Sequence, residues 1–345
     1  MAVLVTGSAG HLGEALMRTL VNAGRPAIGI DVKTSLFTHH VGSITDRDFV
    51  KRCMAGVHAV LHTATLHKPH VVTHSRQAFI DTNITGTLNL LEESTAAGVM
   101  PFVYTSTTSV FGRALKPPRD EPAAWITEDV VPAPKNIYGV TKIAAEHLCE
   151  LFHVLRRLPC VILRTSRFFP EADDRQETRQ SYDDCNVKVN EFLFRRADIE
   201  DVVDAHLPAL MKAETIGFGR YIVSATTPFT PHDLQELRAN APAMVRRLVP
   251  RYEELYASRG WSMFPEIDRV YVNERARREL GWRPQYNFAD VVERLLAGRR
   301  PAQSAGPISR IEGISPRGIC RRTVFRRVAS CVLLRRTLLG WPAPS

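Results

Sequence analysis

The chain has 345 residues, of which 44% are hydrophobic and 23% charged, a composition typical of a globular protein with one large core or two smaller ones. Its net charge of +9 could suggest a nucleic-acid partner, but the excess lies entirely in residues 299–345, which contain ten Lys or Arg and the single acid Glu312. Residues 1–298 carry 35 basic and 35 acidic side chains. We therefore expect no nucleic-acid partner.

The cysteines and the apolar runs indicate a cellular compartment. The six cysteines show no C-x-x-C spacing, which argues against a zinc knuckle or a redox pair and fits the reduced thiols of the cytosol. The first expected strand begins at Met1, which leaves no room for a signal peptide. No apolar run reaches the length of about 18 residues that a membrane span requires. We expect a cytoplasmic protein.

A phosphate-binding turn is indicated at the start of the chain. The apolar run Val3–Val5 stops at three glycines with the spacing G-x-x-G-x-x-G, and a helical pattern follows at once. In such a unit the first glycine permits the tight turn, the second lets backbone N–H groups approach a pyrophosphate, and the third lets the helix pack close to the strand. We expect a dinucleotide site formed by Gly7, Gly10, His11, Leu12 and Gly13.

The second expected strand, Ala27–Ile30, ends on an acidic residue, Asp31. A carboxylate placed there, about 20 residues beyond a glycine loop, can accept hydrogen bonds from both ribose hydroxyls of NAD. The 2′-phosphate of NADP would meet a like charge, which Lys33 could partly offset. The sequence therefore favours NAD over NADP without excluding NADP.

Short apolar runs alternate with helical patterns over the first half of the chain. The predicted strands are Val3–Val5, Ala27–Ile30, Ala59–His62, Phe102–Thr105, Val161–Arg164 and, later, Tyr221–Ala225, and the predicted helices are Asp46–Met54, Phe79–Gly98 and Ile137–Leu155. This alternation implies right-handed crossovers and predicts an α/β fold with a doubly wound parallel sheet of the Rossmann type. Ligands of such sheets bind at the carboxyl ends of the strands.

Four histidines follow one of these strands: His62, His67, His70 and His74. The segment contains no acid or cysteine to complete a set of metal ligands. We therefore expect no metal site, and we interpret the segment as a loop over the cofactor.

Hydroxyl groups gather where the strand from Phe102 ends, in the run Thr105–Ser109. Further along, Tyr138 and Lys142 are four residues apart and so share one face of a helix. Because an ammonium near a phenol favours the phenolate, we expect Lys142 to lower the pKa of Tyr138 from about 10. The opposite face of the helix is expected to pack on the sheet; it carries Ile137, Ile143, Ala144, Leu148, Leu151 and Leu155.

The sequence from Met1 to about Arg299 resembles the extended short-chain dehydrogenases/reductases, specifically the NAD-dependent epimerase/dehydratase family. The motifs that carry the resemblance are Thr6–Gly13, Asp31, His62–Ala64, Asn83–Glu92, Thr105–Gly112, Tyr138–Lys142, Asp198–Asp201 and Leu280–Pro284. The resemblance implies that Thr107 binds the reacting oxygen, that Tyr138 is the acid/base and that Lys142 binds the nicotinamide ribose. It also implies cofactor contacts from Ala64 and Asn83.

In this family a hydride passes from a sugar carbon to NAD while the tyrosine takes the hydroxyl proton, and the hydride then returns to the same carbon or a neighbour. Dehydratases of the family carry an Asp-Glu pair directly after the catalytic threonine, where this chain has Thr108 and Ser109, which disfavours dehydration. Sugar-nucleotide epimerases place an asparagine on the substrate pyrophosphate, where this chain has Arg167. An arginine there could bind phosphate or indicate a different substrate. The expected substrate contacts are Ser106, Thr108 and Arg167.

Three segments are expected: a Rossmann domain over residues 1–168, a small and mostly helical C-terminal substrate cap over residues 169–298 with segments that return to the sheet, and a basic tail over residues 299–345. The tail mixes arginine pairs with apolar residues. It is interpreted as a poorly ordered extension, the alternative being an amphipathic helix on a membrane surface.

These features predict an NAD-dependent epimerase or oxidoreductase that acts on a sugar hydroxyl of a nucleotide sugar, in the manner of a UDP-glucose 4-epimerase, and that forms a homodimer. One alternative is an NAD(P)-dependent reductase or dehydrogenase of a non-sugar alcohol or ketone. The other is a noncatalytic NAD-binding sensor, which the set Thr107, Tyr138 and Lys142 disfavours because a sensor has no use for a tuned phenol.

Overall fold

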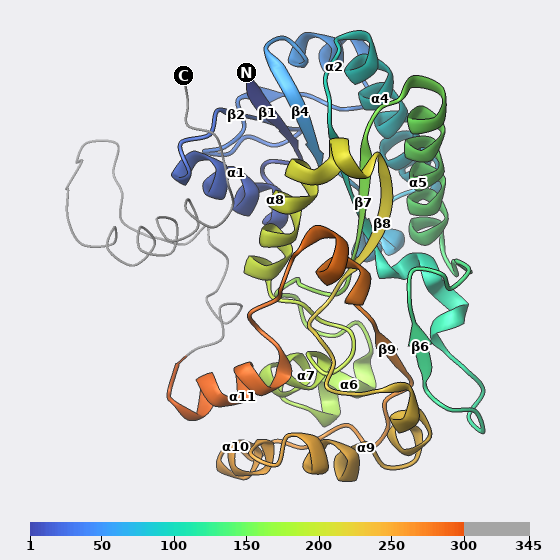
Figure 1. The fold of residues 1–345 in the computed structure, drawn as a ribbon, viewed down its shortest axis with the longest axis vertical. Coiled ribbons are helices and arrows are strands. Elements are labelled where there is room, and N and C mark those ends of the chain that lie inside the picture. Colours follow the sequence, from blue (N-terminus) through green and yellow to red (C-terminus); the bar gives the residue numbers. More distant parts are fainter. Residues whose placement is uncertain (300–345) are drawn as a thin grey trace, which may run out of the picture.

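The computed structural model describes residues 1–299. Figure 1 shows a larger lobe, in which helices cover both faces of a sheet, and a smaller lobe beyond the carboxyl ends of the strands. The chain enters the larger lobe first and builds most of the smaller lobe from its second half.

The central sheet of the described residues has seven strands in the order β3-β2-β1-β4-β5-β7-β8, and all neighbouring pairs are parallel. The chain first builds outward from β1 through β2 to β3 and then returns to the other side of β1, so the sheet is doubly wound and its predicted class is confirmed. Its strands are β1 (Ala2–Thr6), β2 (Ala27–Asp31), β3 (His40–Val41), β4 (Val57–His62), β5 (Phe102–Thr107), β7 (Cys160–Thr165) and β8 (Phe218–Val223).

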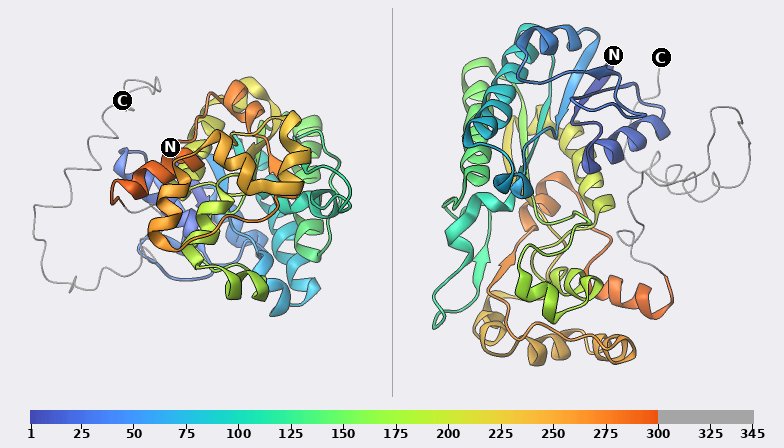
Figure 2. Two further views of the ribbon diagram at one scale, coloured as in Figure 1. Left: turned by 90° about the horizontal axis from the view of Figure 1, so that it is seen from below. Right: turned by 180° about the vertical axis from the view of Figure 1, so that it is seen from behind.

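Helices cover the sheet on both sides (Figures 1 and 2). One side carries α1 (His11–Asn22) and α8 (Ile199–Ile216), and the other carries α2 (Arg47–Cys53), α4 (Gly86–Ala96) and α5 (Ile137–Arg156). Successive strand residues face opposite sides. In β5, for example, Val103 packs in the core beneath α1 and α8, whereas Phe102 and Tyr104 pack in the core beneath α4 and α5.

The predicted orientation of α5 was wrong. The helix turns its Tyr138 and Lys142 side toward the sheet, and its expected sheet-facing residues Leu151 and Leu155 are 47% and 66% exposed. The reason is that Tyr138 and Lys142 find polar partners at the end of β5, so a partly polar face can be buried there. The predicted helix over residues 79–98 is interrupted by a π-helical turn, η2 (Asp81–Thr85), which separates α3 (Arg76–Ile80) from α4.

The smaller lobe has its own apolar core, to which Leu237, Met244, Tyr256 and Val292 contribute. It is mostly helical, as predicted, but it also contains two short parallel strands that were not predicted. Its elements are β6 (Ala124–Ile126), α6 (Gln176–Ser181), α7 (Asp184–Glu191), η4 (Pro231–Asp233), α9 (Leu234–Leu248), α10 (Tyr252–Arg259), β9 (Arg269–Tyr271) and α11 (Phe288–Leu296). The remaining short helices are η1 (Lys68–Val72), η3 (Thr108–Leu115) and η5 (Ala276–Leu280).

Within residues 1–299, no helix combines the length and the apolarity needed to cross a membrane. Apart from its first residue, the basic tail expected over residues 299–345 lies outside the described residues, and so does its suggested membrane contact.

Two carboxyl groups are buried at the start of α8, and one of them joins the helix to the segment that precedes α11. Asp201 accepts hydrogen bonds from the backbone N–H groups of Gln285 and Tyr286 at 2.7 and 3.0 Å. Asp198 caps α8 through its Oδ1 atom, and its buried Oδ2 atom has no hydrogen-bond partner in the described part of the chain. Burial raises the pKa of each carboxyl to about 7, against the backbone hydrogen bonds that lower it.

We expect these carboxyls to make folding depend on pH. Their folded pKa lies above the ordinary value of 3.8, so the folded state holds more protons than the unfolded state between about pH 4 and pH 7, and stability falls as pH rises through this range. Asp198→Asn should reduce the difference in melting temperature between about pH 5 and pH 7.5 by at least about 3 °C. Equal differences in variant and wild type, measured by differential scanning calorimetry, would contradict this account.

Candidate active site

The turn between β1 and α1 is packed too closely for side chains. Gly7 has a φ of +73°, and a Cβ there would lie 2.9 Å from the backbone of Ala64. A Cβ on Gly13 would lie 1.9 Å from the carbonyl oxygen of Gly7. At the N-terminus of α1, Gly10 offers no side-chain cap to the first turn. The turn therefore presents unblocked backbone N–H groups and the positive end of a helix dipole, which suits a pyrophosphate.

Asp31 lies at the end of β2, beside this turn. Its Oδ2 atom accepts a hydrogen bond from the backbone N–H of Ala9 at 3.0 Å, and its Oδ1 atom accepts one from the backbone N–H of Lys33 at 2.9 Å. These bonds fix the carboxylate against the glycine loop while each oxygen keeps a further lone pair. The carboxylate can thus accept hydrogen bonds from the hydroxyl groups of a ribose, which is the role that the sequence suggested.

Two buried polar residues, one at the end of β4 and one beside the loop that follows it, are held by structural partners. His62 is buried and contacts the hydroxyls of Thr6 and Thr87 at 2.7 and 2.9 Å. The amide of Asn83 is also buried: it accepts hydrogen bonds from the Leu66 backbone and the Thr65 hydroxyl and donates two others. Its hydrogen-bonding capacity is filled, so the expected direct contact of Asn83 with the cofactor is corrected to a role in shaping the loop after β4.

The end of β5 brings Thr107 and Tyr138 together. Asn136 caps α5 by accepting a hydrogen bond from the backbone N–H of Gly139 at 3.0 Å, which sets Tyr138 in the first turn of the helix. Tyr138 is 7% exposed, and the side chain of Thr107 acts to lower the pKa of its phenol, so the two hydroxyl groups lie close together. A phenol and a hydroxyl side by side at a strand end can bind one substrate oxygen between them.

Lys142 lies one turn further along α5 and is fully enclosed. Its Nζ atom donates to the carbonyl oxygen of Thr105 at 2.6 Å and lies 4.1 Å from the ring centre of Tyr104. Burial lowers the pKa of Lys142 to about 7, whereas Glu146 acts to raise it. The ammonium is thus held by β5 at the floor of the site.

The predicted effect of Lys142 on Tyr138 was wrong. Burial raises the pKa of Tyr138 to about 12, and the group that lowers it is Thr107, not Lys142. The physical reason is that the Lys142 ammonium is directed to the Thr105 carbonyl and the Tyr104 ring. The phenol is therefore protonated at neutral pH in this arrangement and is suited to donate a proton.

Ser106, an expected substrate contact, has a structural partner instead, and this expectation is corrected. It is buried, and its hydroxyl donates to Glu146 at 2.5 Å on the side of the sheet covered by α5. Thr108, the next candidate after Thr107, is also buried at the start of η3. Glu146 was missed by the sequence analysis, although its spacing of four from Lys142 places it on the same helix face.

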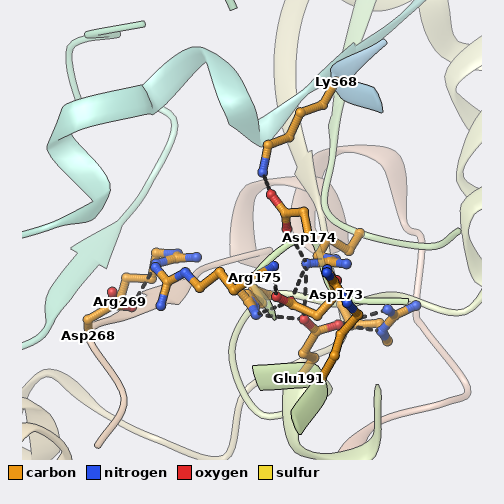
Figure 3. A network of polar contacts seen from close by, with 11 residues as sticks. Lys68, Asp173, Asp174, Arg175, Glu191, Asp268 and Arg269 are labelled. Atoms are coloured by element: carbon orange, nitrogen blue, oxygen red, sulfur yellow. Dashed lines mark hydrogen bonds and ion pairs between the residues drawn. The ribbon is translucent and has the colours of Figure 1, made fainter. Parts of the chain in front are cut away.

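Arg167 belongs to a network of ion pairs in the smaller lobe (Figure 3). Its Nη1 atom lies 2.8 Å from Asp173 and 3.4 Å from Glu191, two buried carboxylates that Arg195 also contacts. Burial alone would raise the pKa of Glu191, but the surrounding arginines, Arg196 among them, lower it to about 2. Asp173 and Glu191 already form ion pairs with the Nη1 atom of Arg167. A substrate phosphate would therefore have to bind this guanidinium alongside the two carboxylates.

The loop after β4 contacts the smaller lobe directly. Lys68 forms an ion pair with Asp174, as Figure 3 shows, and the His67 ring stacks on Phe169 with ring centres 5.2 Å apart. Burial lowers the pKa of His67 to about 4, so its ring is neutral at physiological pH. The loop therefore joins the two lobes at the edge of the site, a contact that no local sequence pattern indicates.

The Asp31 carboxylate should decide between the two dinucleotides. NADP would replace ribose hydrogen bonds by repulsion between close negative charges, so wild-type protein should prefer NAD by at least about tenfold. Asp31→Ala should lose NAD affinity and narrow this preference. Isothermal titration with both dinucleotides measures it; tighter binding of NADP by the wild type would show that Lys33 dominates.

Known proteins share long stretches of this sequence. Residues 3–185, more than half of the chain, match the NAD dependent epimerase/dehydratase family. The chain is 37% identical to a 3 beta-hydroxysteroid dehydrogenase/Delta 5-->4-isomerase of Mycobacterium tuberculosis, over 85% of this chain and 89% of that protein. It is 26% identical to a UDP-glucose 4-epimerase of Rhizobium meliloti, over 84% and 94%. Matches to an uncharacterised protein of Sinorhizobium fredii and to a UDP-glucose 4-epimerase of Streptomyces lividans span 36% and 45% of those proteins.

Solved structures share the fold. A short-chain dehydrogenase/reductase superfamily protein from Agrobacterium tumefaciens with bound NAD has a TM-score of 0.59 and 23% identity, over 86% of this chain and 98% of that one. A UDP-glucose 4-epimerase of Thermotoga maritima with UDP-glucose has a TM-score of 0.59 and 21% identity, over 86% and 99%. The fold, the arrangement of the glycine turn with Thr107, Tyr138 and Lys142, and the match over residues 3–185 together show that the chain belongs to the NAD dependent epimerase/dehydratase family.

Proposed function

We propose that the chain transfers a hydride between NAD and a carbon that carries a hydroxyl group, with Tyr138 exchanging the hydroxyl proton. The observation that carries this proposal is the pairing of Tyr138 with Thr107 at the end of β5, above the buried ammonium of Lys142. In this proposal Thr107 binds the reacting oxygen and Tyr138 is the acid/base.

The residues present fit NAD. The glycine turn with Gly7, Gly10 and Gly13 would hold the pyrophosphate, Asp31 the adenosine ribose and Lys142 the nicotinamide ribose. The nicotinamide supplies the hydride acceptor, and the positive charge of its oxidised form would favour the phenolate of Tyr138. Thr107 and Tyr138 then hold and move the proton at the substrate oxygen, while the enclosing strand end excludes water.

For the substrate we propose a nucleotide sugar, as the sequence predicted. This is supported by cations near the site. Lys135 lies three residues before Tyr138 and forms no ion pair within residues 1–299. Partial desolvation and then the charge of Lys116 lower the pKa of Lys135, and Arg269 and Arg175 act in the same direction, whereas Asp268 acts to raise it. Cations gathered in this way favour an anionic substrate such as a nucleoside diphosphate.

A second candidate is the dehydrogenation of a non-sugar secondary alcohol. The 37% identity to the steroid dehydrogenase exceeds the 26% identity to the epimerase that covers a similar share of the chain. An aromatic group formed by His11, His67, Phe168 and Phe169 provides apolar surface between the lobes. The ion pair between Arg167 and Asp173 also favours a substrate without phosphate, because a paired guanidinium is less available to bind a phosphate group.

One experiment separates the two candidates. Purified protein with NAD is incubated with UDP-, GDP- and dTDP-sugars and, separately, with a 3-hydroxysteroid. A nucleotide-sugar epimerase should isomerise a sugar without net reduction of NAD, whereas an alcohol dehydrogenase should accumulate NADH with the steroid. Isomerised sugar supports the nucleotide-sugar epimerase. Net formation of NADH with the steroid, and no reaction with any sugar, supports the alcohol dehydrogenase in its place. No reaction with either class of substrate contradicts both proposals.

The chemical step is tested by Tyr138→Phe, which removes one hydroxyl and leaves the dinucleotide contacts in place. Turnover should fall on the order of 10²- to 10⁴-fold, the usual effect of losing a positioned acid/base. The dissociation constant for NAD should change little. Full turnover in the folded variant would remove Tyr138 from the mechanism and contradict its assignment as the acid/base.

The homodimer and the cytoplasmic location that the sequence suggests both remain predictions. The outward face of α5 supports a homodimer, because Val140, Leu151 and Val154 are exposed along it.

A further inference from the structure

A buried carboxylate lies directly beneath the proposed catalytic residues. Glu146 is on α5, one turn after Lys142, and has no exposed surface. It accepts a hydrogen bond from Ser106 on β5 at 2.5 Å and one from Arg164 on β7 at 2.8 Å. Arg220 on β8 forms an ion pair with it at 3.4 Å. One carboxylate therefore joins three strands to the helix that carries Tyr138 and Lys142.

The charges around Glu146 are unequal. Arg164 is buried and directs its Nε and Nη2 atoms to this carboxylate, while its Nη1 atom donates to the carbonyl oxygen of Glu128. Arg220 has a second partner, Glu150, which is half exposed. Without Glu146, the buried guanidinium of Arg164 would lose its ion-pair partner. That partner lies on α5, the helix that also carries the Lys142 ammonium. Like charges in a low dielectric repel strongly, so Glu146 counterbalances both cations.

We propose that Glu146 is a positioning residue for the reaction proposed above: its buried carboxylate fixes Ser106 and the end of β5 against α5 and favours the ammonium form of Lys142 over the neutral amine. Glu146 itself touches neither cofactor nor substrate in this proposal. It acts through Lys142, which is held by the carbonyl oxygen of Thr105, the residue directly before Ser106.

The groups that face Lys142 single out Glu146. His62 on β4 is neutral, because burial and Lys142 itself lower its pKa well below the ordinary value. Cys149 on α5 remains a thiol, because burial raises its pKa well above the ordinary value. His67 in the loop after β4 is also neutral, and Tyr104 on β5 offers its ring. Of these groups around Lys142 in the described structure, Glu146 alone carries a carboxyl group, and it acts to raise the pKa of Lys142.

The test is Glu146→Gln, which removes the charge and keeps the shape. The Lys142 ammonium should then lose its proton about one pH unit lower, because the opposing charge is gone and Arg164 is left unbalanced. Lysine ε-carbon NMR on protein with ¹³C-labelled lysine measures this midpoint, with the Lys142 resonance assigned by Lys142→Arg. The alkaline limb of the kcat/KM profile should move to lower pH by the same amount.

Glu150→Gln is the matched control. It makes the same substitution one turn further along α5 and removes the other partner of Arg220, but Glu150 does not contact Ser106 or Arg164. This variant should leave the Lys142 midpoint and the kcat/KM profile as in the wild type. Glu146→Asp keeps the charge and should shift the midpoint less than Glu146→Gln.

If Glu146→Gln fails to fold, the double variant Glu146→Gln/Arg164→Met removes both charges of the pair and is titrated in its place. Its Lys142 midpoint should lie below that of the wild type, and a midpoint equal to that of the wild type would overturn the proposal. A Lys142 midpoint in Glu146→Gln equal to that of the wild type or of Glu150→Gln would overturn the proposal. The NMR titration needs no substrate. A shifted midpoint in a protein without turnover on any substrate would therefore reject the proposed function and leave the link between Glu146 and Lys142 standing.

Discussion

The inward polar face of α5 is the constraint on which the site depends. Tyr138, Lys142 and Glu146 are spaced by four residues, so they share one helix face, and this face is buried against β5. Burying a phenol, an ammonium and a carboxylate is costly unless each has a partner. The partners are Thr107 for the phenol, the Thr105 carbonyl oxygen for the ammonium, and Ser106 with Arg164 for the carboxylate. The catalytic geometry and the packing of α5 are therefore one arrangement.

This arrangement also explains which predictions from the sequence held. Strand runs and the glycine turn are local signals, and β1, β2, β4, β5 and β7 lie within a few residues of the predicted ranges because apolar β-branched runs mark buried parallel strands. The orientation of α5 was mispredicted because hydrophobic periodicity assumes that the apolar face is the buried one. A helix that buries charges against polar strand ends violates that assumption, and such violations are expected at functional sites.

The remaining differences come from contacts between residues far apart in the sequence. The resemblance to the family assigned Asn83 and Ser106 to ligands, but in the structure their hydrogen-bonding groups contact Leu66 and Glu146. Arg167 was predicted either to bind phosphate or to indicate a different substrate, and in the structure it pairs with Asp173. The ion pair between Lys68 and Asp174 closes the same edge of the site from the other lobe. No single-sequence pattern encodes these pairs, because each depends on how the smaller lobe packs beyond the strand ends.

A crystal structure of the protein with NAD bound tests the central claim most directly. The account predicts the adenosine ribose on the Asp31 carboxylate, the pyrophosphate at the backbone N–H groups of the glycine turn, and the nicotinamide ring beside Tyr138 and Thr107. The Lys142 ammonium should then contact the nicotinamide ribose. A nicotinamide ring bound away from Thr107 and Tyr138, with Lys142 still confined to the Thr105 carbonyl oxygen, would contradict the proposed site.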